Sequence, residues 1–417
     1  MKRLLLSFIF FFGVAGAPIR TAMAEETSPT LNLEEILREA VEKNLEILAA
    51  EKREHAAEER IPQARAWDDP QIGVTQWSIP SNFNVGKADE TWYTLSQSFS
   101  FFGKRALRGG VATLDRSMAS EEARGVRLRV VRETKQAYYD LFFARKALDI
   151  HHEQEELTRK FSQIAQEKFS VGAVGQQDVL RAQVELLNLV NHLETLEQDV
   201  ETAEARLNTL LDRPPGGAPL GLPQPPAFPA VEPTLETLQR EAEEARPENR
   251  TQVLAIQKGK ESVQLAKRDL YPDVTAEVAY WDVHDGANRW MASIKINIPW
   301  VNKKKYEARV RENEAEESRA KATHQAVINQ THLRVKELFA RLENSKRLVK
   351  LYRSGLLPLA EQSLEAAAIG YQTKKNDFLT LIDAQKSLKD LELTYFSGLT
   401  EIQKTLAELE EMTEKGF

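Results

Sequence analysis

The sequence has 417 residues, no cysteine and a formal net charge of −7, with 42% hydrophobic and 29% charged residues. Without cysteine the chain has no disulfide framework, thiolate zinc site, cysteine nucleophile or cysteine-linked lipid. The acidic balance argues against a nucleic-acid partner, since phosphate binding needs a basic surface. A mean hydropathy of −0.46 excludes a protein built from many membrane-spanning helices, but not a membrane barrel, whose strands are half polar.

Residues 1–24 have the layout of a secretory signal peptide. Lys2 and Arg3 precede an apolar stretch over residues 4–17, and Ala22-Met23-Ala24 supplies a small-residue cleavage pattern. The apolar stretch is short for a transmembrane helix. We therefore expect export and cleavage after residue 24, with an uncleaved anchor as the alternative.

The remaining chain is a duplication at an offset of 202 residues. Residues 213–233, between the halves, hold eight prolines and three glycines, a composition that predicts a linker without helix or strand. We expect a first repeat over 25–212 and a second over 234–417. The matching segments are 29–31 with 233–235, 69–72 with 271–274, and 180–183 with 382–385.

Each repeat is predicted to run helix, β-hairpin, long helix, turn and helix. Apolar residues at helical spacing predict opening helices over 33–65 and 235–270, the second interrupted at Pro247. Alternation of apolar and polar residues then predicts hairpins at about 70–102 and 272–300.

After each hairpin comes a long segment without proline, over residues 104–168 and 303–357. As one helix the first would reach ~100 Å at 1.5 Å per residue. Helices of this length must bury their apolar stripes on one another, as in antiparallel coiled coils. A structural rod would use the same helices.

All six tryptophans fall within or at the edges of the hairpin windows. Tryptophan and tyrosine collect at membrane interfaces, because one edge is apolar and the other forms hydrogen bonds. The alternative is a soluble sheet with tryptophan in its core. A change of phase between Val74 and Trp77 predicts a bulge in the first strand. The expected membrane-interface aromatics are Trp77, Trp92, Tyr93, Trp281, Trp290 and Trp300.

Two hairpins supply four strands, too few to close a membrane barrel. Open sheet edges are not tolerated in hydrocarbon, and the smallest single-chain barrels have eight strands. We therefore expect several copies to share one barrel. Two copies would give eight strands and three would give twelve, and the number of strands per chain is compatible with either assembly.

Several motifs resemble those of the TolC-like outer membrane efflux family, most of all its heavy-metal-efflux (CzcC-like) branch. The resemblance covers essentially the whole mature chain. Its motifs are Leu31-Asn32-Leu33-Glu34-Glu35 at the first helix, Phe102-Gly103-Lys104-Arg105 and Ile298-Pro299-Trp300 where strands lead into long helices, and Arg246-Pro247-Glu248 followed by Tyr271-Pro272-Asp273.

The resemblance implies a mostly α-helical fold with a small membrane β part. It implies a homotrimer with a 12-stranded barrel in the outer membrane of a Gram-negative bacterium, continued by an α-helical tunnel in the periplasm. The partners implied are a periplasmic adaptor (membrane fusion protein), an inner-membrane pump reached through the adaptor, and outer membrane lipid. The channel would be a passive duct.

The resemblance also implies roles for the turns between paired long helices. They would form the periplasmic tip and contact the adaptor, through Val171, Gly172 and Ala173 in the first repeat and Tyr371 and Lys374 in the second. Acidic residues just beyond the turns would line the entrance. The matching positions are Asp178 and Asp383, with Arg181 and Thr380 at the equivalent places in the other repeat.

Three copies of an aspartate would form an anionic ring that concentrates cations. Asp178 has two plainer interpretations, as a solvated residue near the start of a helix or as the partner of Arg181 at i, i+3.

No hydrolase, metalloprotease or P-loop motif is present. Adjacent His151 and His152 point to different faces of a helix, so we interpret them as part of a solvated charged stretch rather than as metal ligands. We expect no enzyme activity, cofactor or resident metal. A periplasmic adaptor and a helical rod remain the alternatives, and the cargo, whether metal, drug, solvent or peptide, stays open.

Overall fold

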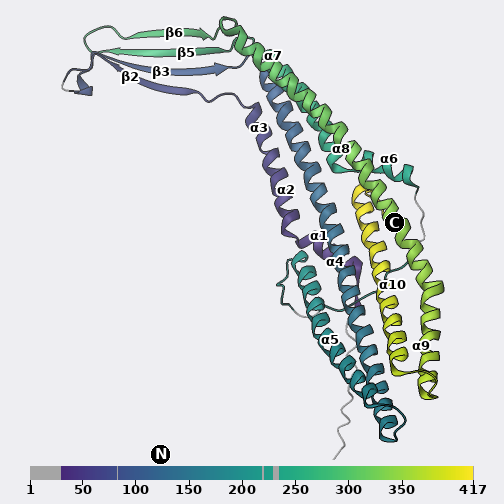
Figure 1. Cartoon of the computed structure of the whole chain (residues 1–417). Coiled ribbons are helices and arrows are strands. Elements are labelled where there is room, and N and C mark those ends of the chain that lie inside the picture. Colours follow the sequence, from purple (N-terminus) through teal and green to yellow (C-terminus); the bar gives the residue numbers. More distant parts are fainter. Residues whose placement is uncertain (1–29, 82, 218–219, 229–233, 417) are drawn as a thin grey trace, which may run out of the picture.

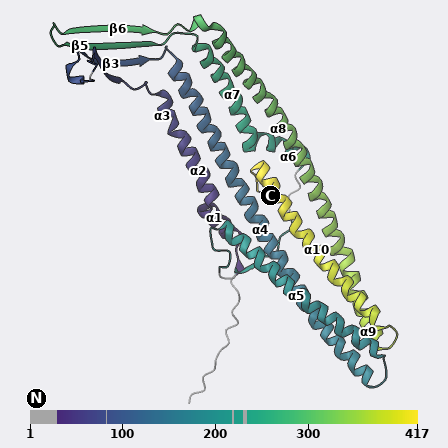
Figure 2. The same ribbon diagram turned by 60° about the vertical axis from the view of Figure 1, so that its left-hand side comes forward.

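The computed structural model describes residues 30–81, 83–217, 220–228 and 234–416. The expected signal peptide lies outside these residues and stays a prediction. Figures 1 and 2 show a long helical body with a sheet at one end, and the strands run at a steep angle to the helices.

The first repeat contributes helices α1 (Leu33–Lys43), α2 (Leu45–Glu58), α3 (Arg60–Arg65), α4 (Lys104–Ser170) and α5 (Gln176–Leu210). The second contributes α6 (Leu235–Ala245), α7 (Pro247–Arg268), α8 (Lys303–Leu351), α9 (Leu357–Gln372) and α10 (Phe378–Thr413). The strands are β1 (Thr30–Leu31), β2 (Gln71–Trp77), β3 (Glu90–Phe99), β4 (Leu222–Pro223), β5 (Val274–Val283) and β6 (Arg289–Ile296). Short turns of helix are η1 (Val85–Lys87), η2 (Pro299–Asn302) and η3 (Tyr352–Leu356).

The mostly helical fold expected from the sequence is confirmed. Helix α4 has 67 residues, so its length is about 100 Å at 1.5 Å per residue. The second long helix is interrupted instead: α8 passes through the π-helical turn η3 into α9, where Pro358 lies in the first turn.

Buried residues recur every seven positions along the long helices. On α4 the series runs through Val130, Ala137, Ala144 and on to Ala165, while on α10 it includes Leu381, Leu388, Ile402 and Leu409. A seven-residue period keeps one seam on the neighbouring helix and imposes a left-handed supercoil. The small alanines of α4 let helices approach closely on several sides, and this helix packs against α2, α5, α7 and α10.

Three apolar clusters hold the body together. One contains only first-repeat residues, around Leu141 and Leu207, or linker residues packed with them. Another contains only second-repeat residues, around Leu338 and Ile402. The third lies near the far turns and combines Phe161 and its neighbours from α4 and α5 with residues of α9 and α10. The helical tip is therefore built by both repeats together.

The first opening helix is more broken than expected, whereas the second has the expected interruption at Pro247. Instead of one helix over 33–65, the chain turns at Asn44, whose side chain accepts hydrogen bonds from the first turn of α2 and donates to the Leu210 carbonyl at 3.0 Å. The equivalent position of the second repeat, Arg246, has nearly the same backbone angles and precedes Pro247. A side chain that caps the next helix competes with continuation of the previous one.

The proline-rich segment is not free of strand structure, which corrects the sequence-based expectation. Leu222 and Pro223 pair in parallel with Thr30 and Leu31. The backbone nitrogen of Gln224 donates to the Tyr138 hydroxyl of α4 at 2.7 Å. Pro223 has no backbone N–H to donate, which is tolerated at the edge of a sheet.

The four longer strands form one antiparallel sheet in the order β2-β3-β5-β6. The central pair β3–β5 joins the two repeats, from Glu90 opposite Val283 to Phe99 opposite Val274. The expected bulge in β2 is wrong, since its pairing with β3 continues unbroken from Gln71 to Trp77. Trp77 is out of phase with Val74 because it lies on the other face of the sheet.

Two of the motifs noted in the sequence meet where the sheet joins the helices. Lys104, only 2% exposed, donates from Nζ to Asp273 Oδ1 at 2.8 Å and to the Tyr271 carbonyl at 2.9 Å. The same carboxylate oxygen accepts the backbone N–H of Phe101 at 2.7 Å. This contact fixes the start of α4 against the start of β5, and so couples the two repeats at the base of the sheet.

We predict that Lys104→Ala destabilises the folded protein by about 3 kcal/mol, because it leaves a partly buried carboxylate without its cation. Thermal unfolding in detergent measures the effect. Lys303→Ala is the matched control, since Lys303 starts α8 but is exposed and pairs only with Glu307 at 3.3 Å, so its effect should stay within about 0.5 kcal/mol. Equal effects of the two variants would contradict the role of the buried pair.

Candidate functional site: the sheet and the helical tip

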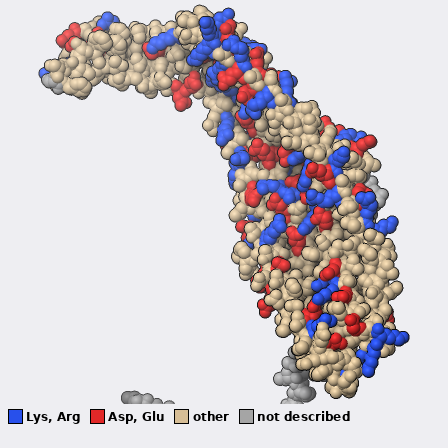
Figure 3. All heavy atoms as spheres, viewed as in Figure 1, with Lys and Arg blue, Asp and Glu red and all other residues tan. Residues whose placement is uncertain are grey.

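One face of the sheet is apolar over most of its length. Strand register places alternate residues of all four strands on this face, and most of the large ones are exposed. The opposite face carries mainly small polar and charged residues. Figure 3 shows fewer charged side chains on the sheet than on the helical body. The apolar face comprises Ile72, Val74, Tyr93, Leu95, Phe99, Val274, Val278, Tyr280, Trp290, Ile294 and Ile296.

The expected membrane-interface aromatics divide between the two faces. Tyr93 and Trp290 lie on the apolar face near its far end, where Trp290 packs against Tyr280 with ring centroids 5.0 Å apart. Trp77, Trp92 and Trp281 lie on the polar face instead. They therefore do not share a face with Tyr93 and Trp290, as one common interface would require: neighbouring strand residues alternate in direction, so Trp92 and Tyr93 cannot face the same side.

The near end of the sheet has aromatic residues of its own. Trp300, in η2, is 57% exposed. Trp67 packs edge-to-face on Phe99 at 5.4 Å, with the Arg105 guanidinium 3.4 Å from the centre of its ring. Aromatic side chains thus bracket the apolar face at both ends.

Strands β2 and β6 each have a single strand neighbour within the described part of the chain. Their outer backbone N–H and C=O groups point away from the sheet. No helix in the described ranges is both long and apolar enough to cross a membrane.

The far end of the helical body carries the two turns expected to contact an adaptor. Val171 is exposed and Gly172 has φ +70°, while Lys374, at the matching position of the second turn, has φ +61°. Lys374 therefore keeps the left-handed geometry that glycine adopts at lower cost. Ala173 is half-buried.

Tyr371 is not on the surface of the turn. It is 2% exposed and packs edge-to-face on Phe378 at 5.5 Å. Lys168, at the end of α4, lies 4.6 Å from the ring centre and donates to the Tyr371 and Gln372 carbonyls. Burial raises the pKa of Tyr371 to about 12. Its role is to tie the two turns together, and we withdraw it from the expected adaptor-contacting residues.

Acidic residues gather beside this turn. Asp178 is half-buried in the first turn of α5, and burial raises its pKa above the ordinary value. The charge of Arg181 opposes this shift and that of Asp377 adds to it. Asp377 was not expected from the sequence as an entrance residue. Its position directly before α10, where aspartate commonly caps a helix, was the available signal.

The other two expected entrance residues have simpler surroundings. Thr380 donates from its hydroxyl and its backbone nitrogen to Asp377, at 2.6 and 2.9 Å, so it takes part in the cap of α10. Asp383 is exposed one turn further along α10. The structure thus brings Asp178, Arg181, Thr380 and Asp377 to one region and leaves Asp383 beside it.

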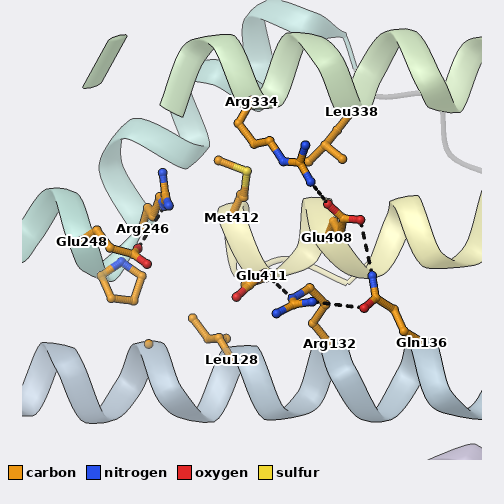
Figure 4. Close-up of a pocket in the computed structure, with 12 residues that line it drawn as sticks. Leu128, Arg132, Gln136, Arg246, Glu248, Arg334, Leu338, Glu408, Glu411 and Met412 are labelled. Carbon is orange, nitrogen blue, oxygen red and sulfur yellow. Dashed lines mark hydrogen bonds and ion pairs between the residues drawn. The ribbon is translucent and has the colours of Figure 1, made fainter. Parts of the chain in front are cut away.

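A cavity of about 380 Å³ lies in the middle of the helical body, between α4, α8 and α10 (Figure 4). Its charged side chains pair with one another: Arg132 bonds Glu411 at 2.6 Å, and Arg334 bonds Glu408. Burial raises the pKa of Glu411, while Arg132 opposes the shift. Since these charges already have partners, the cavity is lined by an internal ion-pair network.

Among the residues described, no group of three or more histidine and carboxylate side chains is placed to hold a metal ion. His151 corrects the expected solvated stretch. It is buried, its Nδ1 lies 2.8 Å from the Ala147 carbonyl, and burial lowers its pKa. His152, on another face of the helix, is about half exposed.

Comparison with known proteins gives consistent matches. The outer membrane efflux protein family model matches residues 36–213 and 238–413, one segment in each repeat. The cobalt-zinc-cadmium resistance protein CzcC of Cupriavidus metallidurans is 24% identical over 399 residues, which are 93% of this chain and 92% of that protein.

Solved structures show the same fold. The outer-membrane channel OprN is similar with a TM-score of 0.76 and 19% identity, covering 92% of this chain and 90% of OprN. CusC is similar with a TM-score of 0.78 and 16% identity, covering 94% of each chain.

We predict that Lys374→Gly stabilises the second turn by about 0.5–1 kcal/mol, because it relieves a left-handed backbone at a non-glycine residue. Amide hydrogen exchange of the turn should slow accordingly. The reciprocal variant Gly172→Lys should destabilise the first turn by a similar amount, since nothing lies within 4 Å of an added Cβ and only the backbone conformation changes. Changes of the same sign in both turns would contradict this explanation.

Proposed function

The chain belongs to the outer membrane efflux protein family; it is an outer membrane efflux channel with a large periplasmic part, and we propose that it is the passive exit duct of a tripartite system. A periplasmic adaptor and an inner-membrane pump would deliver the cargo, and the pump would supply the energy. The observation that carries this proposal is the sheet, whose apolar face and two open edges need both lipid and further strands. Neither a periplasmic adaptor nor a structural rod needs such a sheet.

We propose a homotrimer. Each chain brings four strands, and in hydrocarbon every backbone N–H and C=O needs a partner. Edge strand β2 of one copy beside β6 of the next satisfies both edges at once. Three copies give a 12-stranded barrel that can enclose a water-filled lumen, whereas the interior of an eight-stranded barrel is filled by side chains.

The adaptor would contact the far turns. Of the residues expected to contact it, Val171, Gly172 and Lys374 are exposed, whereas Ala173 is half-buried and Tyr371 is buried. Lys374 and Lys375 give the second turn a positive charge that the first turn lacks. The two turns would therefore present an adaptor with similar backbone conformations but different side-chain charges. This difference would allow the adaptor to distinguish the repeats.

Divalent metal cations are the cargo that we propose. The relative named for cobalt-zinc-cadmium resistance matches 93% of this chain. Asp178, Asp377 and Asp383 lie near the tip, where the charge of Arg181 acts on the first two, so three copies would place a ring of carboxylates around the entrance.

Reconstitution in planar bilayers tests the duct. The protein extracted from outer membranes should behave as a trimer in detergent and give stepwise conductance. A monomer that extracts without detergent and does not conduct would contradict the proposal.

Asp178→Asn together with Asp383→Asn should lower the cation-to-anion permeability ratio by about twofold or more, because charge at a constriction sets ion selectivity. Asp390→Asn is the control, since Asp390 is 71% exposed and pairs with Lys389 at 3.6 Å. Reversal potentials under a salt gradient measure the ratio. An unchanged permeability ratio would show that the entrance carboxylates do not set the ion selectivity.

The selectivity should also depend on pH. Because burial raises the pKa of Asp178, this carboxylate is protonated at a higher pH than an ordinary aspartate. As the pH falls, selectivity should begin to drop above the usual range for aspartate. Asp178→Asn should abolish that part of the pH dependence.

Deletion of the gene tests the cargo. A deletion strain should become sensitive to cobalt, zinc or cadmium and keep its resistance to hydrophobic drugs. Complementation with the wild-type chain is the control. Sensitivity to drugs alone would exclude metal cations as the main cargo.

A further inference from the structure

Three tryptophans form a continuous stack across the polar face of the sheet. The rings of Trp77 and Trp92 are 5.9 Å apart and inclined by 3°, and those of Trp92 and Trp281 are 4.6 Å apart and inclined by 6°. They come from β2, β3 and β5, which are adjacent strands. All three lie at the end of the sheet that is remote from the helices.

The stack is held by a compact set of polar contacts. Trp92 Nε1 donates to Glu90 at 2.8 Å. Arg289, directly opposite Trp281 on β6, has its guanidinium 5.3 Å from the Trp281 ring and lies 3.4 Å from Glu90. One positive and one negative charge therefore accompany three indoles, and the group has no net charge.

The rest of this face is different. Between the stack and the helices, the same face of the central strands carries Thr94, Ser96, Ser98, Thr275, Glu277 and Ala279. Five of these six are polar and none is aromatic, so the aromatic side chains of this face are confined to one level. Each indole is far larger than the threonine and serine side chains below it.

We propose that these tryptophans, repeated in each copy of the assembled channel, form an inward-facing aromatic collar that narrows the outer mouth and limits the size of exiting solutes. This inference rests on the proposed trimeric duct, in which the polar face of the sheet lines the lumen. The collar consists of Trp77, Trp92, Trp281 and Arg289. A 12-stranded barrel lies between eight-stranded barrels, which side chains fill, and 16-stranded barrels, which hold an open channel, so side chains at one level decide its width.

The collar is continuous across the boundary between copies. Within one chain the stack ends at Arg289 on edge strand β6 and at Trp77 on edge strand β2. Joining β6 of one copy to β2 of the next brings the cationic end of one stack to the uncovered ring of the next. A guanidinium over an indole face is favourable, so this contact adds to the pairing of the edges.

The collar and the entrance differ in what they select. The entrance carries aspartates, whose negative charge would favour cations over anions. The collar has no net charge and presents indoles, so it acts on size. Small hydrated cations would pass both, whereas bulky polar solutes would be held back at the outer mouth from either side.

Conductance tests the collar directly. Trp92→Ala with Trp281→Ala should raise single-channel conductance by about 1.5-fold or more, because a wider pore lowers resistance. The cation-to-anion permeability ratio should stay unchanged. The control is Trp290→Ala, at the same end of the sheet but on the apolar face, which should leave conductance as in the wild type. If the wild type conducts and the double variant has the same conductance, the collar is contradicted. The proposed exit duct is not contradicted by that result.

Fluorescence quenching tests the orientation without requiring a wider pore. Two variants keep one tryptophan each, Trp92 or Trp290, with the other five replaced by phenylalanine. In reconstituted vesicles, aqueous acrylamide should quench Trp92 and brominated acyl chains should quench Trp290. Quenching of Trp92 by brominated lipid would overturn the collar. Quenching of neither residue by brominated lipid would contradict the membrane sheet itself.

Discussion

The structure depends on one constraint, which is that a four-stranded sheet with an apolar face leaves two rows of backbone groups unpaired. In water the apolar face would aggregate, and in lipid the unpaired N–H and C=O groups would each cost several kcal/mol. In the proposed barrel, neighbouring copies would pair the edge strands and lipid would cover the apolar face. The packing of α4 on α7 is consistent with this sheet, because the two helices extend from the neighbouring strands β3 and β5 and lie side by side. Lys104, buried against Asp273, fixes the angle at which they leave.

The duplication accounts for the similar backbone of the two repeats. Differences in sequence between them alter the turns at the helical tip. Asp212 and Glu414 are equivalent by the offset of 202, and both adopt the left-handed backbone just after a long helix. At the tip the repeats diverge: Gly172 matches Lys374, and Gly175, which has no capping side chain, matches Asp377, which caps α10. The shared backbone maintains the turns, while the changed side chains alter the charge of the entrance.

Much of the fold could be predicted from the sequence, because period two marks strands and proline-free helical spacing marks long helices. The faces of the sheet were harder to predict. Grouping tryptophans by position along the chain ignores the phase of each strand, and Trp92 next to Tyr93 must face the other way. The family resemblance places Tyr371 in an adaptor-contacting turn, but Lys168 from the other repeat covers it. Contacts between repeats are set by tertiary packing, which no local pattern contains.

Cross-linking between sheet edges tests the central claim most directly, since the chain has no cysteine of its own. Thr75 of β2 and Met291, Ser293 or Lys295 of β6 lie on the same face at the two edges, too far apart in sequence and sheet order to join within one chain. Replacing Thr75 and one β6 residue at a time with cysteine and oxidising the protein in membranes should give covalent dimers and trimers and nothing larger. Absence of cross-links for every pair, or a ladder that continues beyond three, would contradict a barrel shared by three copies.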